Sequence, residues 1–147
     1  MKRRILGFTL MLLALSGCAP SGAPTAPPES ASAPSVSARS SAVAQAHGLH
    51  ITGGAVVIDT ALPGRLDDAN WGPKAAVSRD AGFDLAPLAG RSVVLARYAV
   101  SERYGREPLY LWLVENGDRV VGAYLSVRER STLTPGVFSL DDTGIGR

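Results

Sequence analysis

The residues best suited to metal binding or acid–base chemistry are few. His47 and His50 are the only histidines among the 147 residues, and they stand three apart in the sequence HGLH. On a helix this spacing brings two imidazoles to one side, where they could share a metal ion. Gly48 disfavours a helix there, and no third ligand lies nearby in the sequence. We therefore expect a solvated junction rather than a metal centre.

Two pairs of adjacent aspartates are the other candidates for acid–base chemistry. Asp67 and Asp68 form the first pair, and Asp141 and Asp142 the second. Adjacent residues on a helix do not face each other, and the first pair suits a helix start, where negative charge is favourable. The second pair lies in a polar, glycine-rich end that is expected to fray. The sequence therefore predicts no catalytic carboxylate pair.

Motifs for nucleophilic catalysis and phosphate binding are not recognisable either. The chain has no Gly-x-Ser-x-Gly turn, and TGIGR and ITGG are too short and wrongly flanked for phosphate loops. We therefore expect no catalytic residues, no cofactor and no metal. The alternative is a small envelope enzyme, or a subunit of one, whose site is assembled from distant residues. A pocket that joins His50 to one of three aspartates would favour it, namely Asp59, Asp67 or Asp68.

The single cysteine, Cys18, stands in a context that gives it a chemical role. Three basic residues, 2–4, open the chain, and an apolar run of eleven residues fills 5–15. Such a pattern is typical of an export signal, and the run is shorter than the ~20 residues that span a membrane. The sequence LSGC at 15–18 resembles the lipobox of bacterial lipoproteins. The resemblance implies a diacylglyceryl group on the Cys18 sulfur, cleavage before Cys18 and a stable two-chain anchor.

On this interpretation residues 1–17 are a lipoprotein signal peptide, and the protein lies on the extracytoplasmic face of the cell membrane. Loss of the leader leaves 12 basic against 13 acidic residues. A chain so nearly neutral has no basic patch for a nucleic acid, so a nucleic-acid partner is not expected.

The chain then divides into a tether and a domain. Residues 18–47 are mostly Ala, Pro and Ser, and they have too few large apolar side chains to offset the entropy of ordering. We expect a disordered tether there, although 42–47 could form either a short helix or more linker. Residues 48–147 have a common size for one domain.

Strand-length apolar runs dominate the expected domain. Three of them, at 91–100, 108–115 and 119–127, predict an antiparallel meander, and the β-branched residues 56–58 predict an N-terminal strand. A short helix is expected over about 73–81, between these strands. The expected fold class is therefore α+β, with a small antiparallel sheet packed by one short helix.

The hairpin between the last two runs predicts a register. Asn116-Gly117 is typical of a two-residue type I′ loop. It predicts the facing pairs Leu113 with Val120, Leu111 with Gly122, Leu109 with Tyr124, and, on the other surface, Trp112 with Val121 and Tyr110 with Ala123. Both surfaces are apolar and need cover. One is expected under the helix, and the other under the N-terminal layer or the tail at 134–140. Left uncovered, Tyr110, Trp112 and Leu125 would form an interaction surface.

The order of these features resembles a known family. The sequences AAVSRDAGFDLAPLAGRSVVLARYAV and LYLWLVENGDRVVGAYLS are similar to domain-of-unknown-function family 4830, found in exported and lipid-anchored bacterial proteins. The likeness covers about residues 42–126. It is carried by structural residues: Gly82, Asp84, Leu85, Gly90, Asn116, Gly117 and Gly122. It implies the fold and the surface location, and no reaction.

Together these features favour a lipid-anchored, non-enzymatic binding or accessory domain at the cell envelope. Its expected partners are the membrane, through the lipid on Cys18, and an envelope protein.

Overall fold

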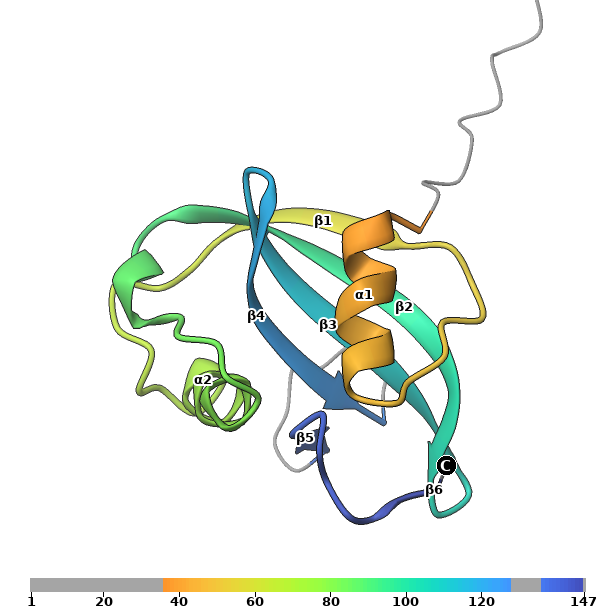
Figure 1. Ribbon diagram of the computed structural model, residues 1–147. Helices are drawn as coiled ribbons and strands as arrows, with labels where there is room; N and C mark the ends of the chain where they lie inside the picture. Colours follow the sequence, from red (N-terminus) through yellow and green to blue (C-terminus); the bar gives the residue numbers. More distant parts are fainter. Residues whose placement is uncertain (1–35, 128–135, 147) are drawn as a thin grey trace, which may run out of the picture. The chain divides into compact units, whose positions relative to one another are not determined.

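The structure, a computed structural model, describes residues 36–127 and 136–146. The predicted signal peptide, Cys18 and the first part of the predicted tether lie outside these residues. The elements, in chain order (Figure 1), are α1 (Ala38–Ala46), β1 (Val56–Ala61), α2 (Trp71–Asp80), the 3-10 turn η1 (Ala86–Leu88), β2 (Ser92–Tyr104), β3 (Glu107–Asn116), β4 (Arg119–Ser126), β5 (Val137–Phe138) and β6 (Ile145–Gly146).

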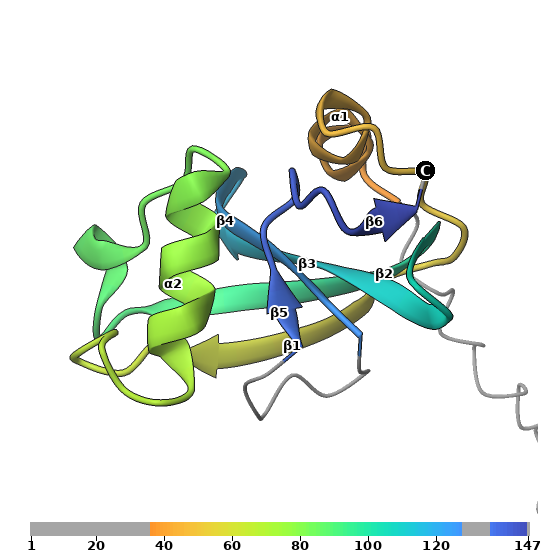
Figure 2. The ribbon, with the colours of Figure 1, turned by 90° about the horizontal axis from the view of Figure 1, so that it is seen from below.

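The strands form one twisted antiparallel sheet in the order β1-β2-β3-β4-β5, and β6 pairs with β2. The α+β class is therefore confirmed, together with the meander and the strand at 56–58. The expected element count is too low, because β5 and β6 extend the sheet and a second helix, α1, packs on it. Figures 1 and 2 show α1 over β2 and β3, and α2 beside the end of the sheet near β4 and β5.

The predicted hairpin register is wrong, although the loop has two residues. Asn116 pairs with Arg119, so Gly117 and Asp118 form the loop, with Gly117 at a φ of 61°. A β-bulge follows, because Glu115 pairs with Val120 while the preceding residue of β3 pairs with Gly122. Together, the position of the loop and the bulge shift the pairing of β4 with β3 by three residues from the predicted register. Since an odd shift moves every side chain to the other face, Leu111 lies opposite Leu125 instead of Gly122.

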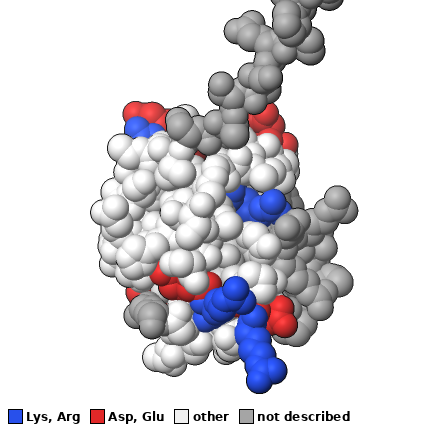
Figure 3. All heavy atoms as spheres, turned by 90° about the vertical axis from the view of Figure 1, so that its right-hand side faces the viewer, with Lys and Arg blue, Asp and Glu red and all other residues white. Residues whose placement is uncertain are grey.

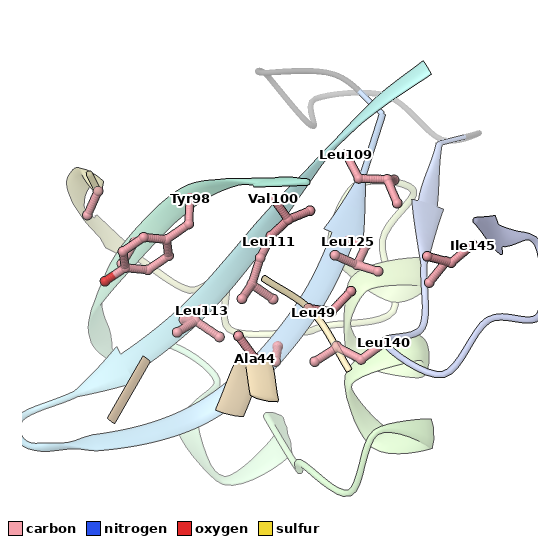
Figure 4. Close-up of a cluster of buried hydrophobic side chains, with 13 residues drawn as sticks. Ala44, Leu49, Tyr98, Val100, Leu109, Leu111, Leu113, Leu125, Leu140 and Ile145 are labelled. Atoms are coloured by element: carbon pink, nitrogen blue, oxygen red, sulfur yellow. The ribbon is translucent and has the colours of Figure 1, made fainter. Parts of the chain in front are cut away.

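One face of the sheet forms the larger core. Side chains of β2, β3 and β4 pack there against the end of α1 and the C-terminal segment (Figure 4). Its innermost members are fully or almost fully buried: Ala44, Leu49, Leu109, Leu111, Leu113, Ala123, Leu125 and Leu140. Leu140 and Ile145 belong to the C-terminal end, so that end is packed rather than frayed. The expectation that the tail helps to cover a face of the sheet is confirmed.

The opposite face is covered by α2 and the turn that follows it. Trp71 and Ala75 of α2, with Leu85 and Leu88 after it, pack against β2, β3 and β4. Trp112 stacks on Tyr124 there, with ring centroids 5.9 Å apart. The Ser78 hydroxyl donates to the main-chain oxygen of Ala123 at 3.0 Å, which fixes α2 against β4.

The helix-start role expected for the first aspartate pair is confirmed at Asp68. The Asp68 carboxylate accepts from the main-chain N–H groups of Asn70 and Trp71, which caps the helix start. The helix begins at Trp71, two residues earlier than expected. Gly82 follows the helix at a φ of 86°, a conformation that glycine adopts without strain.

Helical structure begins earlier than the expected domain start at Gly48. Helix α1 lies inside the segment 18–47 that the composition predicts to be a tether. Ser37 caps it, and the buried Ser40 hydroxyl lies 2.9 Å from the Tyr98 hydroxyl of β2. Composition failed here because Ser and Ala side chains are small enough to pack closely on the sheet.

Candidate functional site

The clearest polar site joins His50, in the segment after α1, to Glu102 near the end of β2. The His50 N–H donates to Glu102 Oε2 at 3.0 Å, and His50 Nδ1 lies 2.7 Å from Glu102 Oε1. The Ser101 hydroxyl also donates to Oε1, at 3.0 Å. The carboxylate side chain is 4% exposed, whereas the imidazole is 76% exposed. A buried carboxylate therefore orients an exposed histidine.

The hydrogen bonds of Glu102 also set its charge. Burial acts to raise the pKa of this carboxyl, but hydrogen bonds from the His50 main chain, the His50 ring, the Glu102 main chain and Ser101 together outweigh burial and lower the pKa below its usual value. Glu102 is therefore ionised at neutral pH. Because an ionised carboxylate only accepts, His50 Nδ1 carries the proton and Nε2 is the ring atom left for other contacts.

A cavity of about 280 Å³ adjoins His50. It lies between α1 and the segment that carries His50. Its walls are mainly apolar, with two polar side chains from α1, and they consist of Val36, Ser41, Ala44, Gln45, Leu49, His50 and Ile51. The cavity offers an exposed imidazole beside an apolar surface.

The pair supplies only part of a catalytic apparatus. His50 is oriented as a general base should be, but the Ser101 hydroxyl bonds to Glu102 rather than to the imidazole. The arrangement can thus move a proton to or from water, and it lacks the serine–histidine contact of a nucleophilic triad. Within the described ranges, no group of three or more His, Cys, Asp and Glu side chains could hold a metal ion.

The other predicted polar candidates have structural roles. His47 caps the end of α1, and its Nδ1 lies 2.9 Å from an Asp141 carboxylate oxygen, which ties the helix to the C-terminal segment. The junction expected at the histidines is solvated at His50, whose ring is 76% exposed, and less so at His47, whose ring is 17% exposed, and both rings bind carboxylates. Asp67 pairs with Arg65 at 2.6 Å, which lowers the pKa of Asp67. His50 is joined to Glu102 and to none of the three aspartates considered.

Glu102 is the residue that sequence reasoning missed. Every second residue of β2 from Ala96 to Glu102 is buried. The alternation of that strand was a usable signal, since it directs Glu102 inward with Tyr98 and Val100. A buried glutamate needs partners, and nothing near it in sequence indicated that His50 would provide them.

The predicted interaction surface does not exist as a surface. Trp112 is 4% exposed and Leu125 is fully buried, and the corrected register places them on opposite faces of the sheet. The Trp112 indole N–H donates to the Ser126 hydroxyl at 3.0 Å. Tyr110 is half-buried, and the Arg97 guanidinium lies 5.2 Å from its ring centroid. Both faces are covered, as the alternative expectation held.

The exposed apolar surface lies instead on β1. Val56, Val57 and Ile58 are 45%, 49% and 42% exposed, and they are the large apolar side chains that stand out among the described residues. In the strand order β1 is terminal, with β2 on one side. The main chain on its other side is therefore open to another strand, which is the arrangement that sheet proteins usually avoid at an apolar edge.

On the side of the molecule that Figure 3 presents, charge does not single out another surface. Figure 3 shows basic and acidic atoms close together in small groups on the side of the molecule it presents, with uncharged atoms between them. Mixed charge of this kind does not make an electrostatic binding surface for a polyanion. No helix in the described part of the chain has the length and apolar character needed to cross a membrane.

Comparison of the chain with protein-family models, with curated proteins and with solved structures found no match. The resemblance to family 4830 therefore stays a prediction.

Proposed function

We propose that the protein is a lipid-anchored extracytoplasmic domain that binds an envelope protein through the open edge of its sheet. The observation that carries this proposal is β1, whose apolar side chains are exposed on both faces of an unpaired edge. Such an edge binds an extended segment by main-chain hydrogen bonds, with side chains adding specificity.

The anchor is tested separately from the edge. Cys18→Ser removes the atom that would carry the lipid, so the full chain should pass from the membrane fraction to the aqueous phase or remain unprocessed. An unchanged membrane association and apparent mass would contradict the lipoprotein proposal.

A photo-crosslinking side chain at Val57 tests the edge in native membranes. Val57 is expected to give a discrete crosslinked product. The matched control is Ala76, which is exposed on α2. Equal labelling from both positions would show that β1 is not a selective binding surface.

A second candidate function is a small envelope enzyme with His50 as general base. The buried, ionised Glu102 that orients the exposed imidazole beside a cavity favours it. Hydrolysis of a chromogenic ester by the processed protein should then fall to background in His50→Ala and decline less in Gln45→Ala. Activity that survives His50→Ala would remove this candidate.

A further inference from the structure

The open edge of β1 presents a defined set of main-chain groups. The Leu62 N–H donates to the Arg91 carbonyl at 2.9 Å, and the same register pairs Ile58 with Leu95. In an antiparallel ladder alternate residues exchange hydrogen bonds with the neighbouring strand. Thr60, Ile58 and Val56 therefore bond to β2. Val57, Asp59 and Ala61 turn their N–H and C=O groups outward.

We propose that the strand bound at this edge is β1 of a second copy, related by a two-fold axis at Val57. The inference rests on the proposed function of the edge as a strand-binding surface, and it names the partner. Two sheets joined in this way become one continuous sheet. The interface is isologous, because the same residues serve on both copies.

Side-chain matching favours a second copy. Val56 and Ile58 lie on one face of β1, and Val57 lies on the other. A second β1 presents the same side chains, so about the axis Val57 meets Val57 and Val56 meets Ile58. Exposed apolar groups are then paired on both faces, and cross-strand apolar pairs stabilise a sheet.

The charge of Asp59 selects the position of the axis. An axis at Asp59 places two carboxylates directly opposite, and one at Ile58 leaves them ~7–8 Å apart on the diagonal. An axis at Val57 separates them by four residues, about 13 Å along the strand. Of these three positions, only the last pairs outward main-chain groups and also avoids like-charge repulsion.

The N-terminal part of this chain is a poor competitor for the edge. A bound strand must donate main-chain N–H groups, and proline has none. Residues 19–35 contain five prolines, at Pro20, Pro24, Pro27, Pro28 and Pro34. Anchoring two copies in one membrane would also raise their effective concentration.

Disulfide trapping tests the axis in the full chain, in membranes. Val57→Cys should form a reducible dimer under mild oxidation, because directly paired, hydrogen-bonded residues are ~5.5 Å apart at Cα, within disulfide range. Ala61→Cys, also exposed and on the same face, should not, because its two copies are far apart. The parent chain, with Cys18 alone, gives the background. A stronger dimer from Ala61→Cys or Ile58→Cys would overturn the proposed axis.

A charge exchange at Val57 tests the partner. Two full chains with different tags are solubilised together, and the tags of the parent should co-purify. Val57→Lys alone and Val57→Glu alone should each reduce co-purification by at least about tenfold, since like charges meet at the axis. A mixture of Val57→Lys and Val57→Glu should restore it, an outcome that only self-pairing explains.

The outcomes separate this inference from the proposed function. If tags never co-purify, yet Val57 still crosslinks to a protein of different mass, the second copy is wrong and the strand-binding edge stands. If Val57 gives neither product, both proposals fail.

Discussion

At the scale of single residues, Glu102 is the group whose chemistry differs most from what its surroundings in sequence suggest. Its buried carboxylate binds the exposed imidazole of His50, so the contribution of Glu102 to stability depends on whether the carboxylate is protonated. Hydrogen bonds lower its pKa, so the stability it contributes is present above the pKa of the unfolded chain. That stability is lost as the pH falls through the pKa of the folded state.

Glu102→Gln should therefore lower the free energy of unfolding at pH 7, by about 2 kcal/mol, because bonds to a charged acceptor are replaced. Glutamate carboxyls ordinarily titrate near 4.5, so the difference between variant and parent should shrink below that pH. Urea unfolding at pH 7 and pH 3 measures it, with Glu107→Gln, at an exposed glutamate of β3, as control. An equal loss of stability at both pH values would contradict the assignment of a negative charge to the Glu102 carboxylate.

Gly122 shows why one glycine stands inside an otherwise apolar strand. A Cβ built on it would lie 2.6 Å from Leu85 Cδ2 and 3.1 Å from Val114 Cγ2. Leu85 is buried and cannot easily move. Gly122→Ala should thus destabilise the fold by about 1–3 kcal/mol through overpacking.

The matched control is Gly64→Ala, since a Cβ there meets no atom within 4 Å. Adding Leu85→Ala should make the effect of Gly122→Ala smaller, because it removes the clashing atoms. Thermal unfolding of Gly122→Ala, Gly64→Ala, Leu85→Ala and the double variant measures both effects, and a Gly64→Ala loss as large as that of Gly122→Ala would refute the steric explanation.

At the scale of elements, the sequence was informative where a local signal decides the structure. The apolar runs of β2, β3 and β4 and the cap at Asp68 are local, and their elements were predicted correctly. The register of β4 depends on where Gly117 stands in the loop and on a bulge, and a three-residue displacement put Leu125 on the wrong face. Patterns of apolar residues do not reveal bulges.

The length and packing of helix α1 were not predicted from the sequence, for a different reason. Its residues have weak apolar character, and it is held by a polar contact with β2, which stands 58 residues away in the sequence. The His50–Glu102 pair likewise joins residues 52 apart. Contacts over such separations are set by the assembled sheet and leave no trace in local composition.

Ser40→Ala should test how α1 is held on the sheet. The Ser40 side chain is buried and its hydroxyl lies 2.9 Å from that of Tyr98, so the variant leaves a buried hydroxyl unpaired. We expect a loss of about 1–2 kcal/mol in the free energy of unfolding. Tyr98→Phe should add little to Ser40→Ala, because the bond that it removes is already lost there, whereas Ser40→Ala also loses the 2.7 Å contact between the Ser40 and Ser37 hydroxyls.

Ser41→Ala, on the same helix, is the control, and it should lie within about 0.5 kcal/mol of the parent. Additive losses from Ser40→Ala and Tyr98→Phe in denaturant unfolding would show that the two hydroxyls do not act as a pair.

At the scale of the whole molecule, β1 differs from the other strands in how much of its sheet edge is exposed. The edge of β2 that pairs with β1 is paired further along the strand with residues 50–52 and then with β6. On the opposite side β5 and α2 lie against β4. Strand β5 ends the sheet on that side, and its Val137 and Phe138 are half-buried, so the exposed valines and isoleucine of β1 are the feature that folding itself does not explain.

The limits of the folding unit give a last test. A chain that begins at Val36 retains α1, whereas one that begins at Gly48 loses Ser40 and Ala44 from the packed face and His47 from its contact with Asp141. Since 1 kcal/mol corresponds to ~4–8 °C for a domain of this size, the shorter chain should melt about 10 °C lower or more. Scanning calorimetry on both chains measures the difference. Equal melting temperatures would mean that the domain begins at Gly48, as composition alone suggested, and that α1 is only part of the tether.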